Sequence, residues 1–76
     1  MQTIKNTTLL DLINAEISKL PNYDSTIKIE KVSVNFFDGS LTYISNINAT
    51  DERIFLVREY IEQIDHIFQG KYNRLF

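Results

Sequence analysis

The stretch TIKIEKVSVNFFDGSLTYISNIN, residues 26–48, decides the fold of this 76-residue chain. Apolar and polar residues alternate on both sides of Asp38-Gly39, as they do in strands that bury one face. Asp-Gly is typical of a type I′ turn, and a type I turn followed by a glycine bulge is a close alternative. We therefore predict a β-hairpin with strands over 26–37 and 40–48.

A two-residue turn fixes which strand residues lie opposite one another, and it pairs Val34 with Tyr43. Because side chains alternate between the two faces, this pairing also decides which of them point toward a core. The predicted core-facing residues are Val32, Val34, Phe36, Leu41 and Tyr43.

Ile27 and Ile29 have the wrong parity for that face. A β-bulge makes two residues of one strand oppose a single residue of the other, and so it reverses the parity beyond it. A bulge at Glu30-Lys31 would turn both isoleucines inward and place Ile29 opposite Ile47. We therefore predict a bulge at that position.

An amphipathic helix is predicted before the hairpin, over residues 8–20. Its apolar face consists of Leu9, Leu10, Leu12, Ile13, Ile17 and Leu20, which recur at the helical period. Thr7 or Thr8 is suited to the N-cap. Pro21 ends the helix, because the residue before a proline is restricted to extended conformations.

A second helix is predicted after the hairpin, over residues 51–69. Its apolar seam consists of Ile54, Val57, Ile61, Ile64 and Phe68, widened by Leu56, Tyr60 and Ile67. Asn48 or Thr50 is suited to the N-cap. Gly70 is the expected stop, and residues 71–76 form a short tail.

These elements predict a single α+β domain over residues 1–76, in the order helix, strand, strand, helix. Both helices would pack on one face of the antiparallel hairpin, because a two-stranded hairpin is marginally stable alone. Residues 2–5 could add a short third strand.

The small size of the chain predicts a need for a partner. A domain of this length buries only about 60% of its unfolded surface, and small domains often depend on disulfides, metals or oligomerisation. The chain has no cysteine and one histidine, so we expect no disulfide, no metal and no cofactor. It has no signal peptide and no apolar span of ~20 residues, which indicates a cytoplasmic protein without membrane contact.

Three charged residues are the candidates for chemistry. Glu62 and His66 are four residues apart on the second helix, a spacing that can hold a metal, but solvated side chains explain the pair as well. Glu16 lies among apolar residues and could be a base with a raised pKa, but no nucleophile or second acid accompanies it. We expect it to pair instead with a basic group such as Arg53 or Arg58, and we predict no catalytic site and no enzyme.

Apolar side chains that the predicted fold leaves uncovered indicate an interface. The predicted partner-binding residues are Phe37, Ile44, Phe55, Leu56, Tyr60, Ile67, Tyr72 and Phe76. The partner would be a second copy, joined through strand edges or through the second helix, or a larger protein complex.

The sequence therefore favours a small non-enzymatic protein–protein interaction module, an inhibitor or regulator that docks onto a larger macromolecular complex and self-associates as a homodimer. Phage and plasmid inhibitors of bacterial immunity are one class of such chains. The alternative is a nucleic-acid-binding regulator that uses Lys71, Tyr72 and Arg74. The net charge of −2 argues against that alternative, because proteins that grip phosphates are usually basic.

Overall fold

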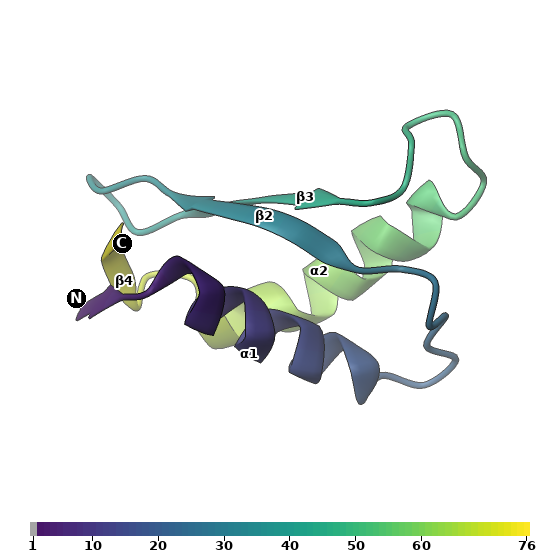
Figure 1. The fold of residues 1–76 in the computed structure, drawn as a ribbon, viewed down its shortest axis with the longest axis horizontal. Helices are drawn as coiled ribbons and strands as arrows, with labels where there is room; N and C mark the ends of the chain where they lie inside the picture. Colours follow the sequence, from purple (N-terminus) through teal and green to yellow (C-terminus); the bar gives the residue numbers. More distant parts are fainter. Residues whose placement is uncertain (1) are drawn as a thin grey trace.

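The computed structural model describes residues 2–76 and shows both helices on one side of a β-hairpin (Figure 1). The elements are β1 (Gln2–Ile4), α1 (Asn6–Ser18), β2 (Ile29–Val34), β3 (Leu41–Ser45), α2 (Ile54–Phe68) and β4 (Tyr72–Leu75). The predicted α+β class and the helix–strand–strand–helix order are confirmed. β1 lies within residues 2–5, where a short third strand was considered, and it pairs with β4, a strand that was not predicted.

The hairpin pairs β2 with β3 in a register that differs from the predicted one by two residues. Val34 lies opposite Leu41, and Val32 lies opposite Tyr43. The predicted two-residue turn is therefore wrong, and four residues, 36–39, form the loop. A shift of two residues preserves the side-chain parity, so the predicted inward face is kept except for Phe36, which lies in the loop and is 67% exposed.

The longer loop is stabilised by its own side chains. The carboxamide oxygen of Asn35 accepts a hydrogen bond from the Phe37 N–H at 2.9 Å, and the carboxylate of Asp38 accepts one from the Ser40 N–H at 2.9 Å. The Gly39 N–H donates to the Asn35 carbonyl at 2.7 Å, with Gly39 at φ +76°. Such local bonds compete with continued strand pairing, and they open the loop earlier than the apolar pattern indicates.

The predicted bulge is confirmed, because the register shifts between Ile29 and Lys31. Ile29 lies opposite Ser45 and not opposite Ile47, since the whole register is displaced. The bulge was predicted because it would turn the isoleucines inward, and Ile27, Ile29 and Ile47 are indeed all buried.

α1 begins two residues earlier than predicted, and neither Thr7 nor Thr8 caps it. The N-cap position is Lys5, which makes no capping bond through its side chain. The Asn6 N–H donates instead to the carbonyl of Phe76 at 2.7 Å. This bond satisfies one of the amides that a helix start leaves unpaired, because the parallel pairing of β1 with β4 brings Phe76 to that point.

α2 begins three residues later than predicted, after a series of side-chain-stabilised turns. Asn48 accepts a bond from the Thr50 N–H at 3.0 Å, and Asp51 accepts one from the Arg53 N–H at 2.9 Å. Neither Asn48 nor Thr50 therefore caps the helix. Gly70 lies two residues beyond Phe68, the last helical residue, and has φ +78°, as expected for a glycine at a helix end.

The core lies between the hairpin and the two helices. It consists of Leu9, Ile13, Ile17, Ile27, Ile29, Val32, Ile47, Val57, Tyr60, Ile64 and Phe68. Leu12, predicted on the apolar face of α1, is 43% exposed, because it lies at the margin of that face. No helix within residues 2–76 combines the length and the apolar character needed to cross a membrane.

The two glycines at the hairpin tip and after α2 provide a matched test of the fold. Both have positive φ, so alanine at either should lower the free energy of unfolding by about 1–2 kcal/mol. Gly39→Ala should cost more than Gly70→Ala, because a Cβ on Gly39 would lie 2.9 Å from the Gly70 Cα whereas one on Gly70 meets nothing within 4 Å. Urea unfolding of both variants measures the difference, and equal losses would contradict the close approach.

Candidate functional site

The free edge of β2 is the first feature of the candidate site. The Asn35 N–H donates to the Ser40 carbonyl at 2.8 Å, which fixes the alternation of the antiparallel ladder. The backbone groups of Ser33 therefore point toward β3, and those of Val32 and Val34 point away from it.

Two asparagines of α1 cover part of this edge. Asn14 accepts from the Ile29 N–H at 2.9 Å and donates to the Ile29 carbonyl at 3.0 Å. Asn6 donates to the Val32 carbonyl at 3.1 Å. These side chains replace a neighbouring strand, and sequence reasoning missed them. The available signal was the presence of two asparagines in α1. Asparagine is a poor helix former, so a role for their side chains could have been expected.

The rest of the edge opens into a groove of about 680 Å³. Its lining residues are Thr3, Asn6, Val32, Ser33, Val34, Phe36, Asn73, Arg74 and Leu75. Within residues 2–76, the Val32 N–H and both backbone groups of Val34 have no hydrogen-bond partner. Arg74 is the sole charged residue among those lining the groove and forms no ion pair with the described part of the chain.

An aromatic pair at the hairpin tip adjoins the groove. The rings of Phe36 and Phe37 lie 4.2 Å apart between centroids, and Phe37 is 81% exposed. Phe76 is 71% exposed, and Figure 1 shows the C-terminus at the same end of the molecule as the hairpin tip. This end therefore combines exposed aromatic side chains with an open strand edge.

The structure separates the residues predicted to bind a partner. Phe37 and Phe76 lie at the groove end, whereas the exposed Ile44 and Phe55 lie on β3 and at the start of α2. The half-buried members, all packed against the core, are Leu56, Ile67 and Tyr72.

Tyr60 is a correction to the predicted contact set. Its side chain is only 3% exposed. The hydroxyl group donates to the Asn22 carbonyl and accepts from the Asp24 N–H, both at 3.0 Å. A buried tyrosine commonly satisfies its hydroxyl in this way, so Tyr60 anchors the loop after α1 and offers no surface to a partner.

The charged candidates lie on two helices, Glu16 on α1 and Glu62 and His66 on α2. Glu16 pairs with Lys19 at 3.3 Å, so the predicted salt bridge is confirmed, with Lys19 as the basic partner in place of Arg53 or Arg58. Glu62 and His66 are both exposed on α2. Among the described residues, no group of three histidine, aspartate or glutamate side chains is placed to hold a metal ion.

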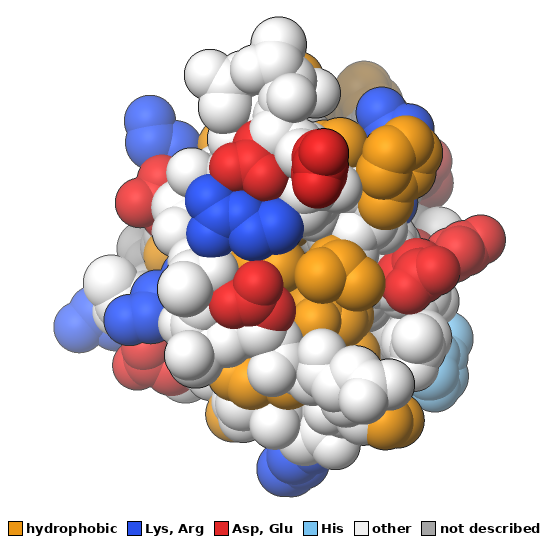
Figure 2. All heavy atoms as spheres, turned by 90° about the vertical axis from the view of Figure 1, so that its right-hand side faces the viewer, with side chains coloured by type: hydrophobic (Ala, Val, Ile, Leu, Met, Phe, Trp, Pro, Cys, Tyr) orange, Lys and Arg blue, Asp and Glu red, His pale blue; other side chains and the backbone are white. Residues whose placement is uncertain are grey.

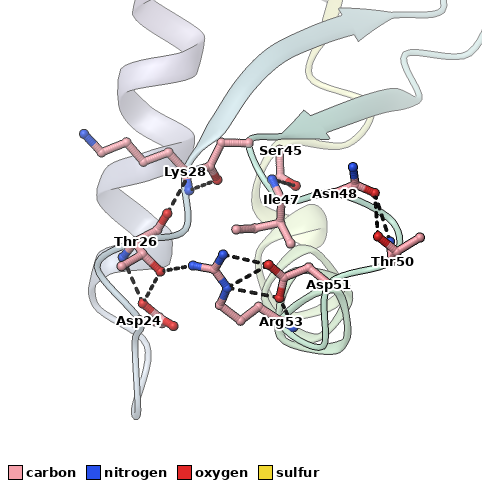
Figure 3. Close-up of polar contacts among 10 residues, drawn as sticks. Asp24, Thr26, Lys28, Ser45, Ile47, Asn48, Thr50, Asp51 and Arg53 are labelled. Atoms are coloured by element: carbon pink, nitrogen blue, oxygen red, sulfur yellow. Dashed lines mark hydrogen bonds and ion pairs between the residues drawn. The ribbon is translucent and has the colours of Figure 1, made fainter.

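A polar cluster around Arg53 ties the loop before β2 to the start of α2 (Figure 3). The guanidinium group donates to the Asp51 carboxylate at 2.7 Å and to the Thr26 hydroxyl at 2.7 Å. The Thr26 hydroxyl donates in turn to Asp24 at 2.6 Å. The hydrogen bonds from Arg53 lower the pKa of Asp51 to about 2, and those from Thr26 lower the pKa of Asp24.

The end of the molecule opposite the groove has no dominant charge. Figure 2 shows acidic and basic side chains interspersed there, with hydrophobic side chains in separate small areas. The polar cluster around Arg53 links two segments of the same chain. This end of the molecule is therefore a less suitable docking surface than the groove end.

Comparison with known proteins adds no relative: no family model, no curated protein and no solved structure matches the chain.

The Arg53 cluster predicts an acid-shifted titration. The folded-state pKa of Asp51 lies below its ordinary value of 3.8, so the stabilisation from this carboxylate is present above about pH 3.8 and is lost as the pH falls toward about 2. Carbon-13 NMR of the carboxyl groups should place its midpoint near the lower value. Arg53→Gln should raise that midpoint, and Lys19→Gln should not; no response to Arg53→Gln would contradict the assignment.

Proposed function

We propose that this chain is a small non-enzymatic protein-interaction module that docks onto a larger protein through its groove end. The observation that carries the proposal is the exposed ring pair of Phe36 and Phe37 beside the open edge of β2. Aromatic side chains are enriched among residues that dominate binding energy. Contiguous exposed apolar surface is also typical of interaction sites.

The energetic case follows from where the aromatic rings lie. Burying a side chain of this size in a partner contributes about 1.5–3 kcal/mol. The core is already closed by other residues, so these rings contribute little to folding while they face water. Their exposure is explained if a partner covers them.

Nucleic-acid binding by the tail has weaker support. Lys71 and Arg74 are exposed, but Tyr72 is half-buried and belongs to β4, which pairs with β1. A base-stacking platform needs an accessible ring face. The tail therefore offers two separate cations and one exposed ring, that of Phe76, and Tyr72 does not supply the stacking surface that the alternative assigns to it.

A pair of exposed phenylalanines allows the proposal to be tested. Phe37→Ser should abolish retention of the partner when tagged chain is isolated from the cells that produce it, and Phe55→Ser should not. Both side chains are largely exposed, at 81% and 69%, so both variants should keep the thermal stability of the wild type within about 0.5 kcal/mol.

Light scattering over a range of concentrations distinguishes the kinds of partner. A molar mass that doubles from 8.9 kDa in the wild type but not in Phe37→Ser identifies a second copy. A wild type that stays monomeric and retains no protein, or that retains the same proteins as Phe37→Ser, refutes docking through this end.

A further inference from the structure

We infer that the groove binds an extended peptide segment of a partner protein, which adds a strand to the free edge of β2 and places a carboxylate against Arg74. This inference rests on the proposed function and specifies its mode. The partner segment would be unfolded or part of a loop, with apolar side chains and at least one acidic group.

The unpaired backbone is the first argument. An exposed strand edge presents a row of donors and acceptors that another chain can pair with, and strand addition of a peptide is a recurrent recognition mode. Asn14 and Asn6 already occupy Ile29 and the Val32 carbonyl. The remaining open groups, at Val32 and Val34, are those that lie in the groove.

The confinement of the open section is the second argument. The asparagines of α1 close the edge on the side of Ile29, and Phe36 marks its other limit at the hairpin loop. Leu75 and its neighbours in β4 form another part of the lining. The flanking residues obstruct the approach of a broad surface such as another folded sheet. A single extended segment therefore fits this short edge better.

The charge of the groove is the third argument. The chain carries a net charge of −2, yet no acidic residue lines the groove and Arg74 does. Arginine binds carboxylates with two parallel hydrogen bonds when the geometry allows it. Phe36 and Leu75 provide apolar surface in the same lining, so the groove complements a peptide that alternates apolar and acidic side chains.

The test uses random linear 12-residue peptides displayed on phage, selected against the immobilised full chain. We expect enrichment of peptides that combine Asp or Glu with β-branched or aromatic residues. A synthetic peptide from the selection, added to nitrogen-15-labelled chain, should slow hydrogen exchange at the amide of Val34. Exchange at this amide should be fast in the free chain, because it is not hydrogen-bonded within residues 2–76 and Val34, unlike the buried Val32, is partly exposed.

Three variants make the test specific. Val34→Pro removes a donor that points into the groove without breaking an internal hydrogen bond, and it should weaken peptide binding at least about tenfold. Arg74→Ala should weaken binding by about tenfold, since a charge-assisted bond is lost. Lys71→Ala is the matched control, an exposed cation outside the groove lining, and should bind like the wild type.

Failure of this inference is distinguishable from failure of the proposed function. No enriched peptide, or a peptide that leaves the Val34 amide unprotected and binds Val34→Pro as tightly as the wild type, overturns strand addition. In that case loss of a captured partner in Phe37→Ser still supports docking by the aromatic pair. A dimer that protects the Val34 amide in the absence of peptide would identify a second copy as the occupant and would also overturn the inference.

Discussion

The close approach of Gly39 to Gly70 is the constraint on which the rest of the structure depends. The Gly70 N–H donates to the Gly39 carbonyl at 3.1 Å, and there is no room for a side chain on Gly39 against the Gly70 backbone. This contact fixes the hairpin tip to the turn after α2. β4 then runs back beside β1, and the carbonyl of Phe76 reaches the first amide of α1. Together, these backbone contacts join the hairpin tip, the turn after α2 and both ends of the chain.

The pairing of β4 with β1 also leaves the groove beside β2 open. Because β4 pairs with β1 and not with β2, the sheet remains divided into two pairs of strands. Asn6 and Asn14 replace the missing neighbouring strand over part of β2. Their hydrogen bonds reduce the free-energy cost of strand N–H and C=O groups that lack a backbone partner. The section near the hairpin tip lacks this replacement and lies next to the exposed rings of Phe36 and Phe37. The proposed docking mode uses the section of the β2 edge whose backbone groups have no hydrogen-bond partner within residues 2–76.

Features set by the burial of one face could be predicted from the sequence, whereas features set by individual hydrogen bonds could not. Parity along β2 and β3 was predictable, because burial of one face imposes a two-residue period, and the bulge followed from the isoleucines that had the wrong parity. The register was not predictable, since a shift of two residues leaves the parity unchanged. The decisive hydrogen bonds are those that the side chains of Asn35 and Asp38 accept from nearby backbone N–H groups. The helix starts were misplaced for a similar reason: a carbonyl from β4 satisfies α1, and side-chain turns precede α2.

The candidate site shows the same division. Exposure of Phe37, Ile44, Phe55 and Phe76 follows from local pattern, because no apolar period includes them. Burial of Tyr60 depends on Asn22 and Asp24, which reach it from a distant loop. The sequence by itself therefore determined the α+β class, the element order and the inward face of the hairpin, since each results from contacts between residues close in the chain. Only the tertiary structure decided the pairing of β1 with β4, the closure of β2 by asparagines and the groove, because these depend on residues brought together from far apart.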